Sequence, residues 1–418
     1  MTRILWTASR RESGDPDASQ SDGQDQPWLM AWTLGWTEMV SWGILFYAFS
    51  ALLVPMRNEF GWSAGLITGA YSLALLVSGM CAPLVGRWID RRGARWLMTL
   101  GSILGTLLVV AWARVDSWPL FYLIWIGIGV AMSLTLYDPG FAAIAPWFHR
   151  NRARALLIIT FFGGLASTVF LPLTGWLEVR LGWRDALLVL AGVLAVCTIL
   201  PHALVLRGAP ESASRSRTFT PSGWKSLVQS AWFQRLSIAY FLQMFVTAGI
   251  SVHMIAYLLD QGVSSTTAAF IAGSVGIFQT VARVLVTIFE TALSVEAMTV
   301  LMFALQMIAI ALLVIMPSGW AVYIAAAMLG IPRGAVTLLR PAILLQHFDV
   351  QEFGSVNGTL AAILTVAGAI APVATGIAVG WFGSYEWIFV FFAVASLAAA
   401  VALWSTRYVD APAIARTL

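Results

Sequence analysis

Ionisable side chains stand inside stretches that are otherwise apolar, and these residues are the best placed to do chemistry. Asp138 interrupts the run "SLTLYDPGFAAIAP", and Glu38 lies within "WTLGWTEMVSWGILFY". Three arginines stand in comparable runs further along the chain: Arg283, Arg333 and Arg340. A guanidinium in a polar cavity is suited to bind both oxygens of a carboxylate. A carboxyl group held away from water is suited to carry a proton.

The composition indicates that these residues lie within a membrane. Of 418 residues, 59% are hydrophobic and 11% are charged, against about 25% charged in an average soluble domain. Apolar runs near or above the ~20 residues that cross a bilayer as a helix occur at about 28–56, 64–86, 96–114, 119–146, 155–177, 185–206, 233–257, 267–289, 297–316, 319–345, 355–380 and 385–404. The sequence therefore predicts an all-α membrane protein with twelve transmembrane helices.

The distribution of basic residues predicts the orientation, because Lys and Arg near helix ends are retained in the cytoplasm. With the N-terminus inside, the predicted inner loops of the first half hold twelve basic residues and the outer loops hold four, namely Arg57, Arg114, Arg180 and Arg184. We therefore expect a multi-pass protein of a bacterial-type cytoplasmic (inner) membrane with both termini cytoplasmic. The net charge of +4 then reports topology and indicates no nucleic-acid partner.

The chain also resembles itself. "LGWRDALLVLAGVLAV" begins at Leu181 and "FGSYEWIFVFFAVASLAAAV" begins at Phe382, so that Gly182 and Gly383 differ by 201. We expect two pseudo-symmetric six-helix halves, which is a transporter architecture with the substrate held near the midplane between them. The predicted parts are a disordered cytoplasmic tail at 1–27, a half at 28–206, a cytoplasmic linker at 207–231, a second half at 232–404 and a cytoplasmic tail at 405–418.

A motif between the second and third predicted helices carries a family resemblance. "GRWIDRRGAR", from Gly86 to Arg95, resembles the signature of the major facilitator superfamily. The resemblance implies the major facilitator fold and a loop that latches the cytoplasmic side, with Asp90 facing the start of helix 11, where the helix dipole favours a carboxylate. Gly86 and Gly93 would permit a tight turn. Arg91 and Arg95 are further gating candidates, although both also suit a role in topology alone.

Asp138-Pro139 and Arg340-Pro341 occupy corresponding places in predicted helices 4 and 10. Charges at membrane depth are rare unless they face a cavity or each other. The resemblance implies that helices 4, 5, 10 and 11 form the cytoplasmic gate. We therefore hypothesise an ion pair between Asp138 and Arg340 that closes the inner side and separates when the cavity opens inward. The alternative is that each residue is satisfied within its own half by an interhelical hydrogen bond.

The sequence around Arg283, "FQTVARVL", is similar to the substrate-binding region of monocarboxylate and oxalate–formate type transporters. The resemblance implies that Arg283 binds the substrate carboxylate, and Gln279, Tyr47 and Arg333 are further substrate-binding candidates. Gln279 stands where animal monocarboxylate transporters have an aspartate, and Tyr47 stands near the place of their helix 1 lysine. Predicted helix 11 has no lysine for a second cationic clamp, which weakens a dicarboxylate assignment. A structural hydrogen bond is the alternative role for Arg283 and for Arg333.

Glu38 and Asp138 are the proton-carrier candidates, since Glu38 lies roughly 15 Å into helix 1. The sequence has no metal-ligand cluster, nucleophile constellation or phosphate-binding loop, so we expect neither an enzyme nor an ATP-driven pump, and no cofactor or metal. We expect a monomeric secondary active transporter that moves a small, monocarboxylate-like organic anion through the lipid bilayer by alternating access, with a proton or a counter-substrate. The alternative is a proton-driven exporter of drugs, metabolites or metalloids, which the many aromatic residues and the partial glycine motif "FFGGLASTVFLPLTGW" would also suit.

Overall fold

The computed structural model of the chain describes residues 25–144, 147–148, 151–206, 224–289, 293–348 and 350–409. These residues form helices joined by short turns, with no strand among them. The helices are α1 (Asp25–Ser41), the π-helical η2 (Trp42–Tyr47), α2 (Ala48–Phe60), α3 (Ala64–Arg92), α4 (Arg95–Ala113), α5 (Trp118–Thr135), α6 (Tyr137–Ile144), α7 (Arg152–Gly164), α8 (Ala166–Leu181), α9 (Trp183–Leu194), the π-helical η4 (Ala195–Ile199), α10 (Leu200–Val205), α11 (Trp224–Gln229), α12 (Ala231–Asp260), α13 (Ser265–Phe289), α14 (Val295–Ile315), α15 (Trp320–His347), α16 (Val350–Phe382), α17 (Glu386–Ser405) and the short 3₁₀ turn η6 (Thr406–Tyr408).

Twelve helical spans are long and apolar enough to cross a membrane, which is the predicted number. Some spans join several elements: α1, η2 and α2 form the first, α5 and α6 the fourth, α7 and α8 the fifth, and α9, η4 and α10 the sixth. Helices α12 to α17 each carry one of the last six. An even number of spans brings the start of α1 and the end of α17 to the same side, here called the terminal side; the other is the opposite side.

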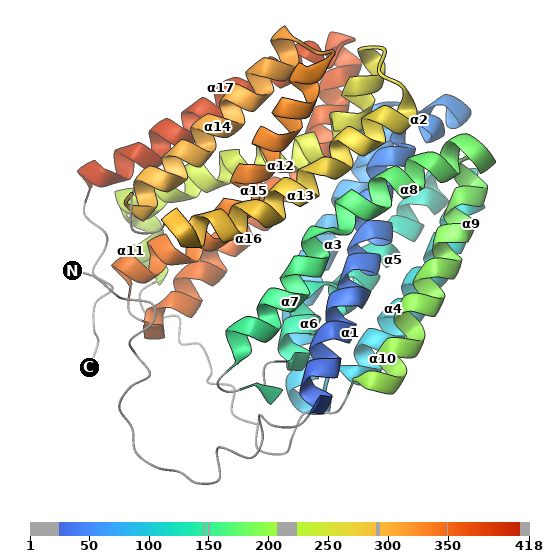
Figure 1. Cartoon of the computed structure of the whole chain (residues 1–418), viewed down its shortest axis with the longest axis horizontal. Helices are drawn as coiled ribbons and strands as arrows, with labels where there is room; N and C mark the ends of the chain where they lie inside the picture. Colours follow the sequence, from blue (N-terminus) through green and yellow to red (C-terminus); the bar gives the residue numbers. More distant parts are fainter. Residues whose placement is uncertain are drawn as a thin grey trace.

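The spans form two bundles, coloured blue to green and yellow to red in Figure 1. In the first bundle α3 packs on α5, α4 on α9 and α1 on α7; in the second, α14 packs on α15 and α17, and α12 on α16 and α17. Between the bundles, α16 packs along α3 and α13 along α8. On the terminal side, α6 packs only against first-bundle neighbours among its main contacts, and the ends of α1 and α7 spread away from those of α13 and α16 (Figure 1). The halves are therefore joined on the opposite side and separated on the terminal side.

The internal repeat is visible in the backbone. Gly61 and Gly262, and likewise Gly182 and Gly383, are pairs 201 residues apart, and all four have positive φ angles of 67°, 81°, 79° and 69° in that order. Each glycine lies in the turn between two spans on the opposite side, where a side chain would be strained. The two bundles thus repeat the same turns at the spacing that the sequence indicated.

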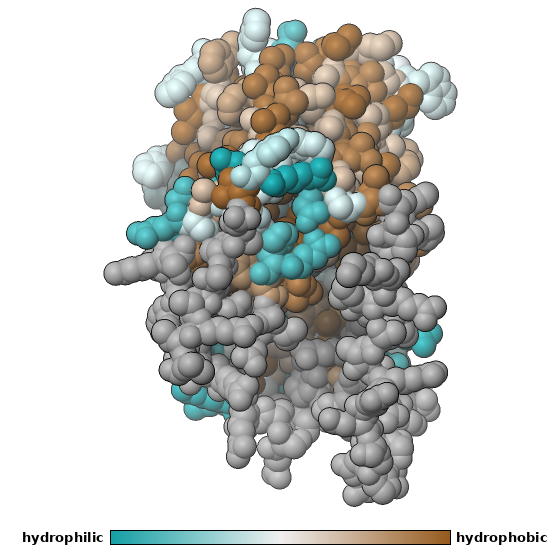
Figure 2. Space-filling model, turned by 90° about the vertical axis from the view of Figure 1, so that its left-hand side faces the viewer, coloured by the Kyte–Doolittle hydropathy of each residue, from teal (hydrophilic) through white to brown (hydrophobic). Residues whose placement is uncertain are grey.

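Apolar side chains cover the outside of the bundles. Trp320 and Trp381, at span ends on the opposite side, are each 83% exposed. Many leucines and valines are also exposed, with smaller exposed fractions. Figure 2 shows the face that lies on the left-hand side of Figure 1, where hydrophobic residues cover most of the upper part and hydrophilic residues gather in the middle. Such a surface suits lipid, with tryptophan at the membrane interfaces.

Close packing between α13 and α15 depends on two glycines of α15, Gly330 and Gly334. A Cβ on Gly330 would meet the carbonyl oxygen of Val275, and one on Gly334 would overlap that of Gln279. Small residues spaced by four allow two helix backbones to approach closely. This contact fixes the rotation of α15 and hence the direction of Arg333, which lies between the two glycines.

Replacing Gly334 by alanine is expected to destabilise the protein by about 1–3 kcal/mol, because overpacking forces the two helices apart. Thermal unfolding of the purified protein in detergent measures this change. Gly192→Ala is the matched control, since nothing lies within 4 Å of a Cβ at Gly192. A melting temperature that falls equally in both variants, or in neither, would contradict the packing described for α13 and α15.

Candidate functional site

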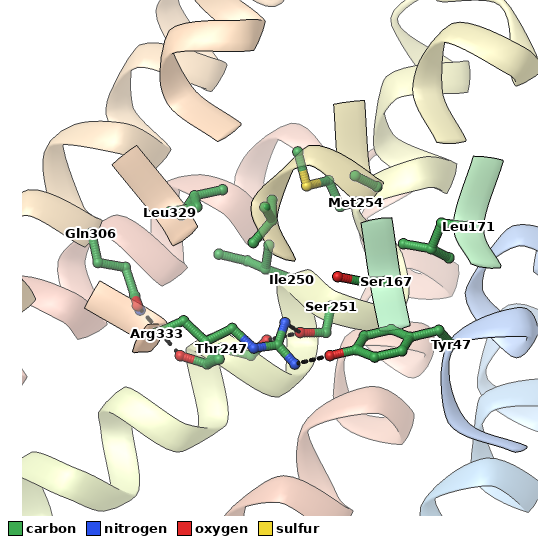
Figure 3. Close-up of a pocket in the computed structure, with 12 residues that line it drawn as sticks. Tyr47, Ser167, Leu171, Thr247, Ile250, Ser251, Met254, Gln306, Leu329 and Arg333 are labelled. Atoms are coloured by element: carbon green, nitrogen blue, oxygen red, sulfur yellow. Dashed lines mark hydrogen bonds between the residues drawn. The ribbon is translucent and has the colours of Figure 1, made fainter. Parts of the chain in front are cut away.

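A pocket lies between the two bundles, and Arg333 is the one charged side chain among the described residues that line it. Its walls come from η2 and α8 of the first bundle and from α12, α13, α14 and α15 of the second. Arg333 Nη2 donates to the hydroxyl of Tyr47 at 2.9 Å, and Nη1 donates to Ser251 Oγ at 2.8 Å (Figure 3). The guanidinium carbon lies 5.7 Å from the centre of the Tyr47 ring. Because Tyr47 and Arg333 belong to different bundles, their contact joins the two halves.

Local irregularity of the first span positions Tyr47. The segment Trp42–Tyr47 is π-helical, and Tyr47 is its last residue. Gly43 in this segment packs directly on the ring of Phe170 in α8, where a Cβ would overlap the ring. A π-helical turn changes the direction in which the following side chains point, and such turns are frequent at functional sites. Tyr47 is 7% exposed and reaches across to α15.

A row of hydrogen-bonding side chains on α12 forms one wall. Gln243, Thr247 and Ser251 are spaced by four residues and so share one face of the helix. Thr247 Oγ1 donates to Gln306 Oε1 at 3.3 Å, and Gln243 Nε2 donates to the same oxygen at 2.6 Å. Figure 3 shows Gln306 on the side of Arg333 away from Tyr47, with Leu329, Ile250 and Met254 nearby. The pocket therefore combines one cation, several neutral polar groups and apolar side chains.

The charge of Arg333 is not balanced by a carboxylate in the pocket. Its hydrogen-bond partners there, Tyr47 and Ser251, are both neutral. In the part of the chain that the structure describes, the ion pairs are those of Arg184 with Glu59 and Asp116, at 2.8 and 2.6 Å. These lie on the opposite side, within the first bundle. A guanidinium at membrane depth is costly unless a counter-charge accompanies it, so this pocket favours an anion.

The pocket is narrow in this conformation. Its free volume is about 30 Å³, which suits only a few water molecules. An organic carboxylate needs more room than this. Binding of a carboxylate to Arg333 therefore requires the space between the halves to widen.

Arg283 does not line this pocket. Its Nη1 donates to the carbonyl oxygen of Thr160 in α7 at 2.7 Å, which is another of the hydrogen bonds between the halves. Gly164 lies beside this contact and packs closely on Thr280 of α13, where a Cβ would lie 2.8 Å from Oγ1. Both α13 and α15 start on the opposite side, and Arg283 is about five residues further along its helix than Arg333. Arg283 therefore lies roughly 7 Å nearer the terminal side.

The structure thus brings two of the four substrate-binding candidates together, Tyr47 and Arg333, and separates the others. Gln279 is 8% exposed, and its carbonyl oxygen packs on Gly334. Neither Gln279 nor Arg283 is among the residues that line the pocket. In this conformation Arg283 makes the structural hydrogen bond that was its alternative role, and its part in substrate binding stays a prediction.

Glu38 lies in a separate, enclosed site in the first bundle. It is fully buried, and neither carboxyl oxygen has a hydrogen-bond partner of normal geometry. The carboxyl packs on Gly140 of α6, close to the indole of Trp42, whose nitrogen also lacks a partner. The fourth span is broken beside this site, since α5 ends at Thr135 and α6 begins at Tyr137. An unpartnered carboxyl that is shielded from water is stable only as the neutral acid.

The hypothesised gate pair is not formed in this conformation. Asp138 is exposed, and Arg340 is half-buried with an Nε that lacks a hydrogen-bond partner. Asp138 lies on α6 and Arg340 on α15, at the terminal side where the two bundles diverge. The described residues contain no ion pair between them. The pair was hypothesised for a state in which this side is closed, and it stays a prediction.

Comparison with known proteins identifies the chain. The family model described as Major Facilitator Superfamily matches residues 32–318 and 236–417. The chain belongs to the major facilitator superfamily. Its members are membrane transporters and not enzymes, so this protein is a transporter of that superfamily.

Relatives of this superfamily member include an MFS-type transporter of Gibberella moniliformis, 24% identical over 374 residues that cover 83% of this chain and 85% of the relative. Monocarboxylate transporter 4 of Rattus norvegicus is 25% identical over 389 residues, 85% of this chain and 80% of the relative. Among solved structures, a mutant of the nucleoside transporter NupG aligns with a TM-score of 0.76 at 14% identity, over 91% of this chain and 99% of that one. A bacterial homologue of the human lysosomal transporter Spinster aligns with a TM-score of 0.71 at 15% identity, over 91% and 96%. These structures confirm the predicted fold.

The superfamily signature loop differs in part from expectation. Gly93 has a φ of 74° and separates α3 from α4, as a tight turn requires. Gly86 instead lies inside α3, with open space around a Cβ, so its predicted role in the turn is wrong. Arg95 donates from Nε to the carbonyl oxygen of Ala203 at 2.7 Å, which ties α4 to α10, while Arg91 is exposed. The expected approach of the Asp90 carboxylate to helix 11 lies outside the described residues.

Sequence reasoning missed Ser251 and Thr247. The signal that could have found them is the spacing of Gln243, Thr247 and Ser251 on one face of a span that is otherwise apolar. The approach of Tyr47 to Arg333 had no local signal, because it results from a π-helical turn in one half and the rotation of α15 in the other.

Tyr47→Phe is expected to lower the stability of the protein by about 1.5–3 kcal/mol, because it removes a neutral partner of a half-buried charged group. The ring remains, so packing is conserved. Thermal unfolding in detergent measures the loss, and Tyr323→Phe serves as control because Tyr323 is 37% exposed on the outside of α15. Equal melting temperatures for wild type and Tyr47→Phe would show that the hydroxyl does not hold the halves together.

Proposed function

We propose that this protein moves a small, monocarboxylate-like organic anion across the membrane by alternating access, with a proton or a second anion as the coupled species. The observation that carries the proposal is the position of Arg333: a guanidinium between the two halves, held only by neutral groups. A carboxylate supplies the missing charge and accepts two parallel hydrogen bonds from the guanidinium fork. The names of the monocarboxylate relatives agree with this substrate class.

Substrate enters from the terminal side, where the halves are separated. The arginine distribution predicts that this side faces the cytoplasm of a bacterial-type cell, and the conformation would then be an inward-facing one. The carboxylate takes the place of the Tyr47 hydroxyl on Arg333, while the apolar part of the substrate contacts Leu329, Ile250 and Met254. Gln279 and Arg283 lie between this pocket and the terminal side, so an anion on its way in or out passes the charge of Arg283.

Release of Tyr47 frees one connection between the halves, and this links binding to movement. In the empty state the hydrogen bonds from Arg333 to Tyr47 and from Arg283 to Thr160 both join the bundles. Closure of the terminal side would bring α6 towards α15, and Asp138 towards Arg340. The ion pair of these residues would then stabilise the state in which the opposite side is open.

Glu38 carries the coupled proton in this proposal. Its burial without partners favours the neutral acid in the conformation described. The break between α5 and α6 and the exposed Asp138, two residues before Gly140, offer a route to water on the terminal side. Asp138 is then the relay and Glu38 the site at which the proton is held during the movement.

Substitution of Arg333 by glutamine is expected to abolish stabilisation by carboxylates. Purified protein is heated with a panel of monocarboxylates, dicarboxylates and cationic drugs, and a ligand at 100 times its dissociation constant adds about 2.7 kcal/mol. Wild type and Arg283→Gln should both gain stability from a monocarboxylate. Arg333→Gln should gain none, because the cation that pairs with the carboxylate is gone.

Two results of this experiment would overturn the assignment. If the carboxylate no longer stabilises Arg283→Gln but still stabilises Arg333→Gln, the anion binds at Arg283, nearer the terminal side. If only apolar or cationic compounds stabilise the wild type, and both variants respond as it does, the protein is an exporter of such compounds and both arginines are structural.

Glu38→Gln is expected to uncouple transport from the pH gradient while leaving the fold intact, because a neutral amide replaces a neutral acid of the same shape. Proteoliposomes with an acidic exterior measure accumulation of a labelled carboxylate, and exchange of internal for external carboxylate measures carrier movement. Accumulation should vanish and exchange should persist. Glu296→Gln, in the first turn of α14, is the control, and accumulation by Glu38→Gln at the wild-type level would eliminate Glu38 as the proton site.

A further inference from the structure

A second concave site lies on the outside of the second bundle, away from the pocket of Arg333. It is a crevice of about 600 Å³ between α12, α16 and α17. None of the described residues that line it is charged. Aromatic rings dominate its walls: Phe245 from α12, Phe382 from α16, and Trp387, Phe391 and Phe392 from α17.

The crevice opens to the surface that faces lipid. At its mouth Phe382 is 63% exposed, Trp387 is 65% exposed and Phe391 is 54% exposed. Towards its floor Phe392 and Thr375 are 1% and 2% exposed. Thr375 is the one polar side chain among the described residues that line the crevice. A site with so few polar groups is poorly suited to bind a water-soluble substrate, and its mouth meets the hydrocarbon of the bilayer.

Depth in the membrane identifies the occupant. Phe382 is the last residue of α16, and Trp387 is the second residue of α17, so the mouth begins at the end of the spans on the opposite side. Thr375 precedes Phe382 by seven residues in α16, which places it roughly 10 Å deeper. Tryptophan at a span end sits at the level of the lipid headgroups, and one leaflet contributes about 15 Å of hydrocarbon.

We propose that this crevice holds one acyl chain of a phospholipid from the leaflet on the opposite side. The headgroup lies beside Trp387, and the chain descends between the rings of Phe382 and Phe391 towards Phe245 and Phe392. Apolar area and ring faces provide the attraction, which needs no hydrogen bond.

An acyl chain in the crevice contacts α12, which also lines the pocket of Arg333. Phe245 faces the crevice, whereas Thr247 and Ser251 on the same helix line the pocket of Arg333. Gly249, between them, packs on Phe392 and Thr375. A chain in the crevice therefore supports the helix that supplies a hydrogen-bond partner of Arg333, from the side away from the substrate.

The test is site-resolved lipid labelling of the full-length protein. It is placed in nanodiscs of palmitoyl-oleoyl phosphatidylethanolamine and phosphatidylglycerol that contain a phosphatidylcholine with a diazirine in mid-chain. After illumination, labelled peptides are mapped by mass spectrometry. Phe245, Ala378 and Phe391 should be labelled more than Val394, which is 60% exposed on α17 outside the crevice.

Filling the crevice distinguishes a retained chain from ordinary lipid contact. Ala378→Trp excludes at least two methylene groups and should reduce labelling of the other crevice residues by about tenfold, without changing labelling at Val394. Leu397→Trp, on the lipid-facing side of α17, is the control and should change neither; Ala374→Leu replaces the test variant if it does not purify. Labelling of crevice residues at the level of Val394, or labelling unaffected by the filled crevice, would overturn the proposal.

Discussion

The guanidinium of Arg333, placed between two membrane-embedded bundles with only neutral partners, is the constraint on which the rest of this account depends. A positive charge at that depth requires either a counter-ion or a set of hydrogen-bond acceptors. In the conformation described, Tyr47 and Ser251 provide the acceptors. Because Tyr47 comes from the other half, the same interaction that satisfies the charge also joins the bundles. In the proposed function, a carboxylate that bonds to both Nη atoms of Arg333 competes with this contact.

Polar groups occur in two layers along the membrane normal. The Arg333 pocket occupies one layer, and Glu38, Tyr137, Asp138 and Arg283 occupy the other, nearer the terminal side. In the layer nearer the terminal side, the glycine pair of α7 allows close packing: Gly163 packs on Tyr137, and Gly164 packs on Thr280. In the proposed function, the anion binds in the first layer and the proton is held by Glu38 in the other. Such an arrangement suits a carrier that couples the movement of a proton to that of each substrate molecule.

The sequence predicts the architecture because a bilayer leaves few solutions. Twelve long apolar runs can only be helices, since every backbone polar group in lipid must be paired within its own segment. The repeat at 201 residues follows from glycines such as Gly182 and Gly383, whose turns demand positive φ. These features are local or periodic. They can therefore be recognised in the sequence without knowledge of any tertiary contact.

The site was only partly predictable, because its geometry depends on how helices from distant parts of the sequence pack together. All the candidate arginines and Tyr47 could be named, yet which arginine meets Tyr47 depends on the rotation of α15 against α13 at Gly334 and on the π-helical turn before Tyr47. Family resemblance favoured Arg283, which in this conformation bonds to the backbone of Thr160. Gly86 illustrates the same limit, because a glycine that suits a turn can equally lie within a helix.

Direct location of a bound carboxylate tests the central claim most sharply. A crystal structure with a bromine-labelled benzoate allows the bromine to be found by anomalous scattering and the carboxylate by its density. The account predicts carboxylate oxygens about 3 Å from the guanidinium nitrogens of Arg333, with Tyr47 moved off the guanidinium. A carboxylate at Arg283, with the contact of Arg333 and Tyr47 intact, would contradict it.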